Sequence, residues 1–417
     1  MAKIKKIIAR EILDSRGFPT IEAIVQLADS SVGIFSTPSG ISTGKHEAVE
    51  LRDQDTTRYH GRGVLRGLEN ILKVLAPRLI GKEASLQEKI DLEMISADGT
   101  TDKSKLGANC ILTLSGAVVK ATAASLKMPL YQYLAHIAAI NTHEFIIPTP
   151  MFNILNGGRH GNDNLDFQEF MVVPPKANSY SSDLKLGVEI YYSLKEAILT
   201  HNAIALIGDE GGYAPTLYSN IDALKIIEEA IAAAGYNIGL DVFFSLDIAA
   251  SHLKRGGAYK IKDRPVALTG SDFIDFYIAL NEQFHPIAIE DPLAEDDWDD
   301  WTALTKKIGN ETLIVGDDLI TTNLERLNKA ISKKAANALI IKPNQVGTIT
   351  ETIQVARAAQ KANFKVIVSH RSGETNDDFI ADFAVAIGAD YVKFGAPARG
   401  ERVAKYNRLL EIEHELS

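Results

Sequence analysis

The sequence predicts an α/β protein in which a small N-terminal α+β domain precedes a closed (β/α) barrel. Two observations, one from each part of the chain, indicate this fold class. The first part of the chain mixes strand-like apolar runs with helical stretches, whereas from about residue 145 short apolar runs alternate with amphipathic helical stretches. The chain has 417 residues, enough for two or three domains. We expect the N-terminal domain to occupy residues 1–140 and the barrel to occupy residues 141–417.

In the N-terminal domain, residues 4–13 and 20–28 are rich in Ile, Leu and Val and are joined by the turn-forming sequence Asp14-Ser15-Arg16-Gly17. This pattern predicts a β-hairpin. The other elements expected here are a loop of small residues and two helical stretches, at 36–44, 62–79 and 107–136.

In the second part, five apolar runs each end at a titratable residue, and consecutive run ends lie 23 to 28 residues apart. This spacing fits a strand, a helix and two loops, and fully apolar strands indicate a buried parallel sheet. In a barrel of such units, the carboxyl ends of the strands meet at one mouth, where active sites lie. The five run ends are Glu290, Asp317, Lys342, His370 and Lys393, and earlier runs add Glu169, Glu210 and Asp247.

Composition excludes several classes of protein. The net charge of −10 lacks the positive field that general nucleic-acid binding needs, so we expect no nucleic-acid partner. The single cysteine, Cys110, excludes an internal disulfide and is typical of a reducing compartment. No apolar run predicts a membrane span and no signal-peptide pattern is present, so we expect a cytoplasmic protein.

Three of the acids, Asp247, Glu290 and Asp317, form a candidate metal site. They offer only oxygen atoms, which suit a hard cation such as Mg²⁺. The alternative is that these acids cap helices or pair with surface lysines.

Lys342 is a candidate general base because it ends an apolar run, where burial and a nearby dication would favour its neutral amine. The alternative is a lysine paired with Asp317 or Glu290. If strand order follows sequence, Glu169 and Glu210 come from the opposite side of the ring, and one of them is a candidate acid.

Two segments are candidate anion-binding sites, His370-Arg371-Ser372-Gly373 and the loop Ser39–Gly44. Arginine offers a bidentate fork to phosphate, and Ser-Gly backbone donors approach oxygen atoms closely. A further glycine-rich loop, residues 156–161, is a candidate lid that contains His160, although a lone histidine in such a loop is often only solvated.

Seven segments are, in order, similar to the motifs of one family. They are Pro38–Gly44, Gln168–Met171, Gly208–Gly212, Glu290–Pro292, Gly316–Leu319, Lys342–Gln345 and Ser369–Thr375. Over nearly its whole length the chain resembles the enolase family. The resemblance implies a modified (β/α)8 barrel of the TIM type, two Mg²⁺ ions per active site and a homodimer or larger homo-oligomer. It also implies the conversion of 2-phosphoglycerate to phosphoenolpyruvate and water.

The resemblance further implies a role for each matching residue. The metal ligands are Asp247, Glu290, Asp317 and, for the second ion, Ser42. The residues of proton transfer and closure are Lys342 as base, Glu210 as acid, Glu169 as its assistant and His160 on a closing loop. The residues that contact substrate are Gln168, Lys342, His370, Lys393 and, at the phosphate, Arg371 and Ser372.

The sequence departs from the family pattern at positions beside these residues, namely Phe18, Ile41, Gly161, Tyr192, His252 and Phe394. Two other functions remain open. One is another magnesium-dependent enzyme of the enolase superfamily, which abstracts a proton next to a carboxylate without a phosphate site. The other is a non-catalytic binding protein, with secretion or display on the cell surface as a secondary location.

Overall fold

The computed structural model describes residues 2–40, 44–140, 144–161, 163–176 and 178–417. The chain forms two compact units, of which the first comprises residues 1–146, 341–358 and 370–388 and the second comprises 147–340, 359–369 and 389–417. Near its C-terminal end the chain therefore passes twice from the second unit into the first and back. The expected domain boundary at residue 140 stays a prediction.

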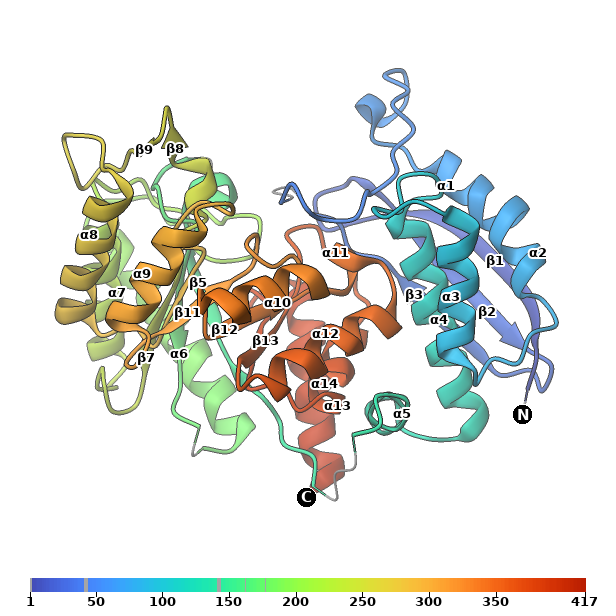
Figure 1. Cartoon of the computed structure of the whole chain (residues 1–417). Coiled ribbons are helices and arrows are strands. Elements are labelled where there is room, and N and C mark those ends of the chain that lie inside the picture. Colours follow the sequence, from blue (N-terminus) through green and yellow to red (C-terminus); the bar gives the residue numbers. More distant parts are fainter. Residues whose placement is uncertain (1, 41–43, 141–143, 162, 177) are drawn as a thin grey trace. The chain divides into compact units, whose positions relative to one another are not determined.

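The first unit contains an antiparallel sheet of three strands (Figure 1). β1 (Ile4–Leu13) pairs with β2 (Pro19–Leu27), which pairs with β3 (Val32–Ser36), so the predicted hairpin is confirmed. Helix α4 (Ala108–Leu126) packs on β2 and β3. The helix comes so close that a Cβ atom on Gly33 would lie 2.2 Å from the carbonyl oxygen of Ala117, so β3 needs glycine there.

The helices of the first unit are more broken than the sequence predicts. The expected helix over 107–136 is two helices, α4 and α5 (Leu130–Ile137), because Lys127 adopts a left-handed conformation (φ 52°) and Pro129 follows. The stretch at 62–79 contains α1 (Leu65–Asn70), the π-helical turn η2 (Ile71–Leu75) and α2 (Ala76–Leu79). The remaining helical elements are η1 (Tyr59–Gly61), α3 (Gln87–Asp98), α11 (Pro343–Val346) and α13 (Phe379–Ala386), and α12 (Ile349–Lys361) starts here and ends in the second unit.

Helix α4 is, in the described part of the chain, the one helix long and apolar enough to cross a membrane by length and composition alone. The expectation that no apolar run is long enough to span a membrane is therefore too strict. In the structure 78% of this helix's apolar window is buried, and packing within the first unit explains its composition.

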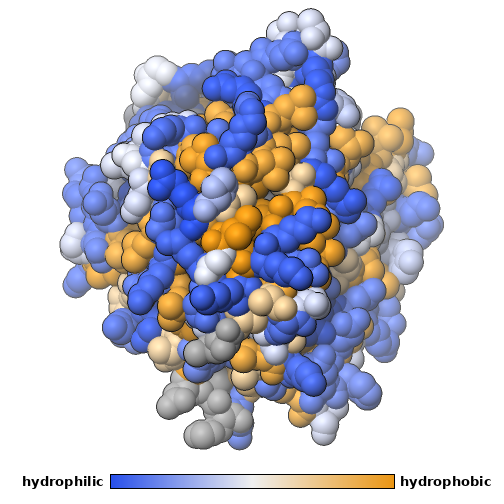
Figure 2. All heavy atoms as spheres, turned by 90° about the vertical axis from the view of Figure 1, so that its right-hand side faces the viewer, coloured by the Kyte–Doolittle hydropathy of each residue, from blue (hydrophilic) through white to orange (hydrophobic). Residues whose placement is uncertain are grey.

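Apolar side chains also reach the surface. Figure 2 shows them gathered in the middle of one face, with hydrophilic side chains around them. On the three-stranded sheet, Ile8, Ile24 and Ile34 lie side by side in register across β1, β2 and β3. Ile8 is 40% and Ile34 is 44% exposed, so this row leaves apolar area uncovered.

The second unit is built on a nine-stranded sheet of described residues, in the order β4-β14-β13-β12-β11-β10-β7-β6-β5. Only Met151 separates β4 (Thr149–Pro150) from β5 (Phe152–Asn156), so the sheet returns to its first strand and forms a barrel. The other strands are β6 (Glu169–Val173), β7 (Phe243–Asp247), β10 (Ala288–Glu290), β11 (Leu313–Gly316), β12 (Ala338–Ile341), β13 (Lys365–Ser369) and β14 (Tyr391–Lys393). The predicted fold class is confirmed.

The barrel departs from regular βα order at its start. β6 runs antiparallel to both β5 and β7, whereas β10 runs parallel to both β7 and β11. Only twelve residues separate the end of β5 from the start of β6, which is too short for a helical crossover and long enough for a hairpin loop. As a result β6 begins at the mouth where β7 ends, and Glu169 pairs with Asp247.

Helices surround the barrel strands, and α7, α8 and α9 lie outside β7 and β11 in Figure 1. The helices of this unit are α6 (Tyr180–Thr200), α7 (Asn220–Ala233), α8 (Gly270–Phe284), α9 (Trp298–Ile308), α10 (Leu324–Lys333) and α14 (Gly400–Leu416). The barrel core is a cluster of buried apolar side chains, Met151, Met171, Val173, Ala288, Val315, Ala338, Ile340 and Ile367. This core fills the barrel and leaves the charged residues to the mouth.

Candidate active site

Five of the predicted site residues lie at one mouth of the barrel. Asp247 and Glu290 are the last residues of β7 and β10 and lie opposite each other in the parallel register. Asp317 follows the end of β11, Lys393 ends β14, and Glu169 begins the antiparallel strand β6. All five side chains are buried, so their charges must be balanced within the site.

The ammonium group of Lys393 balances three of these carboxylates. Its Nζ atom lies 2.7 Å from Oε2 of Glu290, 3.1 Å from Oδ2 of Asp247 and 3.4 Å from Oε2 of Glu169. β14 and β10 are four strands apart in either direction round the barrel, so the lysine reaches across the mouth. Burial alone would lower the pKa of Lys393, but the carboxylates, Asp247 foremost, raise it well above its ordinary value. Lys393 therefore stays charged at neutral pH.

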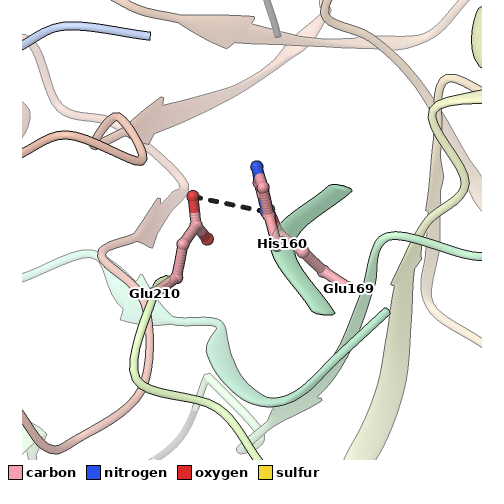
Figure 3. A group of neighbouring side chains, drawn as sticks. All are labelled: His160, Glu169 and Glu210. Carbon is pink, nitrogen blue, oxygen red and sulfur yellow. Dashed lines mark ion pairs between the residues drawn. The ribbon is translucent and has the colours of Figure 1, made fainter. Parts of the chain in front are cut away.

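His160, Glu169 and Glu210 form a buried cluster (Figure 3). Nδ1 of His160 lies 3.4 Å from Oε1 of Glu169 and 3.6 Å from Oε1 of Glu210, and the carboxylate of Glu210 points toward the histidine ring in Figure 3. Burial and then the charge of Glu210 raise the pKa of Glu169. Burial would lower the pKa of His160, but the charges of Glu210 and Glu169 raise it. The cluster therefore holds protons to a higher pH than isolated groups would, as a proton-donating site requires.

The backbone around Glu210 is built for close approach. A Cβ atom on Gly208 would lie 2.6 Å from the carbonyl oxygen of His160, and Gly211 has a φ of +89°. Both positions need glycine. Nδ2 of Asn153, on β5, donates a hydrogen bond of 3.0 Å to Oε2 of Glu210. Asn153 was not predicted, because its segment Phe152–Asn156 shows only that it belongs to a strand.

A second group of acids lies at the ends of β10 and β11. Carboxylate oxygens of Asp291, Asp317 and Asp318 lie within 4.8 Å of one another. The carboxylate of Asp291 accepts hydrogen bonds from the backbone N–H groups of Asp317, at 3.0 Å, and Asp318, at 2.8 Å. Burial and then the charges of Asp318 and Asp317 raise the pKa of Asp291 well above its ordinary value. Asp291 was not predicted, although it directly follows the predicted ligand Glu290.

The predicted metal ligands therefore lie in two adjacent groups, with Asp247 and Glu290 at Lys393 and Asp317 beside Asp291. Seven buried or half-buried carboxylates gather here, and three of them share the ammonium group of Lys393. The seven are Glu169, Glu210, Asp247, Glu290, Asp291, Asp317 and Asp318. Within the described part of the chain, Oε2 of Glu169 and Nδ1 of His160 make no hydrogen bond despite their burial. An excess of buried oxygen ligands with negative charge fits a hard divalent cation.

The expected anion-binding residues belong to the first unit. His370 follows β13 directly, and Arg371 and Ser372 come next, all three buried. Nη1 of Arg371 lies 2.8 Å from Oε2 of Glu47 and 3.2 Å from Oδ1 of Asn344. The arginine fork is thus held in place by a carboxylate that the sequence did not point to.

The loop that contains Ser39 contacts the segment His370–Gly373 through its backbone. Ser39 and Gly373 exchange two backbone hydrogen bonds of 2.8 and 2.9 Å. A Cβ atom on Gly40 would lie 2.0 Å from Nη2 of Arg371, so a larger residue here would push the guanidinium group away from its position beside Glu47. The predicted ligand Ser42 and the departure at Ile41 lie outside the described residues.

Two more predicted residues directly adjoin barrel strands in the sequence. Lys342 follows β12, has the expected extended backbone (φ −133°, ψ 107°) and is half-buried. Gln168 precedes β6, and its backbone N–H donates a hydrogen bond of 2.9 Å to the carbonyl oxygen of Asp247. β6 and β12 are four strands apart in either direction round the barrel, and the roles of the residues at their ends stay predictions.

A buried constellation of acids with one ammonium group at the mouth of an α/β barrel is the arrangement of a metal-dependent barrel enzyme. The chain matches the family model of the enolase N-terminal domain over residues 4–134 and that of the enolase C-terminal TIM barrel domain over residues 144–417. The chain therefore belongs to the enolase family. This match confirms the predicted family and supports a lyase of the enolase superfamily, while the roles of individual residues stay predictions.

Proposed function

We propose that the protein is a phosphopyruvate hydratase, which converts 2-phospho-D-glycerate reversibly to phosphoenolpyruvate and water in glycolysis and gluconeogenesis. The observation that carries this proposal is the proton-holding cluster of His160, Glu169 and Glu210 beside the oxygen-rich acids of the barrel mouth. Loss of hydroxide from carbon 3 needs a proton donor, and removal of a proton from carbon 2 needs stabilisation of an ene-diolate. The enolase superfamily is itself the established example of this chemistry, in which a Lys or His base acts together with Mg²⁺.

In the proposed reaction the neutral amine of Lys342 takes the proton from carbon 2, and the carboxylic acid of Glu210 gives a proton to the departing hydroxide. Glu169 supports this donor, since its own pKa is raised by burial and by Glu210. The charged ammonium of Lys393 attracts the substrate carboxylate, and Arg371 with Ser372 binds the phosphate.

Two Mg²⁺ ions, one held by Asp247, Glu290 and Asp317 and the second with the help of Ser42, would stabilise the negative charge that develops on the substrate carboxylate.

An assay of enol-phosphate ultraviolet absorbance tests the proposal. We expect absorbance to rise when 2-phosphoglycerate and Mg²⁺ are added, and Lys342→Ala to lose nearly all of the rate while keeping its circular dichroism and metal binding. The matched control is Lys306→Ala, because Lys306 is an exposed lysine on α9. Turnover of simple 2-hydroxy acids in place of 2-phosphoglycerate would point to another superfamily activity, and wild-type speed in Lys342→Ala would remove the proposed base.

We also propose that the protein acts in the cytoplasm as a homodimer or larger homo-oligomer. The exposed apolar row of Ile8, Ile24 and Ile34 supports self-association, as do Ile204 and Leu206 of the second unit, which are 71% and 62% exposed. Light scattering after size-exclusion chromatography should give a mass of at least twice 45.4 kDa. A monomer mass at assay concentration would contradict the oligomer.

A further inference from the structure

The second unit contains a cavity of about 790 Å³ that adjoins the predicted substrate residue Gln168, and the other residues that line it have no part in the proposed reaction. Among the described residues that line it, the cations outnumber the acids. The cations are Arg159, Arg255, Lys260, Lys262 and Arg264, and the acids are Asp163 and Asp166. A cavity of this size accommodates a small-molecule ligand. Because the whole chain carries a net charge of −10, this positive charge is a local feature and does not follow from composition.

A small hairpin presents two of these cations. β8 (Lys254–Arg255) and β9 (Ala258–Tyr259) pair antiparallel, near the top left of Figure 1. They are joined by Gly256 and Gly257, whose φ angles of +59° and +87° suit a tight two-residue turn. Nζ of Lys254 lies 2.6 Å from Oδ1 of Asp297, which anchors the hairpin to the loop before α9. The charge of Lys254 is thereby neutralised, whereas Arg255 and Lys260 are exposed at the cavity.

Three of the cations have no carboxylate partner within the part of the chain that the structure describes, namely Arg159, Arg255 and Lys260. Lys262 and Arg264 donate hydrogen bonds to backbone carbonyl oxygens, which leave their charges uncompensated. Asp166 likewise accepts hydrogen bonds only from neutral groups, the side chain of Asn220 and the backbone N–H of Lys262, so the balance is five cations against two carboxylates. The cavity therefore has an uncompensated positive potential that favours an anionic ligand.

His252 also lines the cavity and is one of the positions at which the sequence departs from the family pattern. Its Nε2 atom is buried and makes no hydrogen bond to any described residue. Burial and then the charge of Arg159 lower the pKa of His252, so that the ring is neutral at pH 7. The apolar part of the wall is formed by Leu165, Leu253 and Ile261, and Gln168 adds a polar side chain. The cavity thus combines cations, an unsatisfied imidazole nitrogen and an apolar surface.

We propose that this cavity is a second ligand site, which binds a compound with two or more linked phosphoryl groups through Arg159, Arg255 and Lys260. A single phosphate would compensate only part of this charge, whereas a linked phosphate spans several cations with one ligand. Inorganic tripolyphosphate and nucleoside triphosphates share this chemistry, and only the nucleoside would also use the apolar wall. The site rests on the cavity alone and does not depend on the proposed reaction.

Isothermal titration calorimetry of the full chain tests the site, in buffer without divalent metal because linked phosphates chelate Mg²⁺. The probes are tripolyphosphate, ATP and inorganic phosphate. We expect tripolyphosphate and ATP to bind at least roughly tenfold more tightly than phosphate, and binding to weaken as salt screens the charges. Equal affinity for the two linked phosphates assigns recognition to the phosphates, and tighter binding of ATP assigns a contribution to the apolar wall. If neither binds more tightly than phosphate, the proposal is wrong.

Variants locate the binding. The double variant Arg255→Gln and Lys260→Gln should lose about a hundredfold in affinity, roughly tenfold for each lost charged hydrogen bond, while Lys306→Gln should bind like wild type. Both substituted side chains are exposed, and an unchanged melting temperature confirms that the fold is intact. Arg371→Gln must keep the affinity, since Arg371 belongs to the predicted phosphate site of the first unit. Binding that is lost in Arg371→Gln and kept in the double variant would overturn the proposal.

Discussion

Replacing Lys393 by methionine tests whether its ammonium group holds the acids of the barrel mouth together. Methionine keeps most of the volume of the side chain and removes the charge. Lys393 lies 2.7 Å from Glu290, 3.1 Å from Asp247 and 3.4 Å from Glu169, and the side chains of all four residues are at most 6% exposed. Removing one partner of a buried ion pair costs about 3–5 kcal/mol, because the other charge stays buried without compensation. We therefore expect Lys393→Met to lower the free energy of unfolding by about 3–5 kcal/mol in the absence of metal.

The pH of the measurement follows from the direction of the pKa shift. The pKa of Lys393 is raised, so its contribution to stability is complete below the pKa of an unfolded lysine and is lost only as pH rises through the higher folded value. Urea unfolding at pH 7 to 8 thus measures the full effect. Added Mg²⁺ should stabilise Lys393→Met more than wild type, since the variant has one more uncompensated negative charge for the cation to balance.

The matched control is Lys365→Met, because Nζ of Lys365 makes an ion pair of 2.9 Å with Asp390 at the surface, where the lysine side chain is 48% exposed. A surface pair of this kind contributes less than about 1 kcal/mol. If Lys393→Met and Lys365→Met lower the unfolding free energy equally, the acids of the mouth are not balanced by Lys393 and the reasoning is refuted.

Two further predictions concern buried polar groups. Burial raises the pKa of Asp91 from 3.8 to about 6, so the folded protein holds this proton more strongly than the unfolded chain and loses up to about 3 kcal/mol of stability as pH rises through this range. Asp91→Asn should flatten the unfolding free energy between about pH 4 and 6, and an unchanged slope would contradict the assignment. Asn153→Leu removes the hydrogen bond to Glu210 and should lower kcat by roughly ten- to a hundredfold through misplacement of the carboxyl group. Calorimetry should show unchanged Mg²⁺ affinity in this variant, and a kcat equal to wild type would exclude Asn153 as a positioning residue.

The strand ends were predictable because each of them combines two unambiguous signals. Val315 and Ile340 belong to short runs that are apolar on every side chain, which is typical of strands buried on both faces, and a charged residue then closes the run. The observed strands β11 and β12 end one residue before Asp317 and Lys342. Buried parallel strands end at a common mouth, so a correct prediction of the strands also placed most of the charged strand-end residues at that mouth.

Features that depend on pairing over long distances were not predictable in the same way. The direction of β6 follows from the twelve-residue link after β5, a signal that was available, but its pairing with β7 joins segments about seventy residues apart. The contact of Lys393 with Glu290 likewise joins strands on opposite sides of the barrel. Apolar periodicity shows which face of a segment is buried and gives no information about which side chain lies across the mouth. The same reason explains why Glu47 was not recognised as the partner of Arg371.

Asp291 gives a physical reason why a site predicted from strand ends is incomplete. Its φ of +42° is costly for a residue other than glycine, by about 1–2 kcal/mol. Its carboxyl group accepts backbone hydrogen bonds from Asp317 and Asp318, and a hydrogen bond contributes about 0.5–1.5 kcal/mol, so the two together offset that cost. These two bonds fix the backbone just beyond β11, from which the side chain of Asp317 extends. The position of Asp317 therefore depends on Asp291, the residue that follows the neighbouring strand β10. A prediction based only on the charged residue that closes each apolar run does not find Asp291.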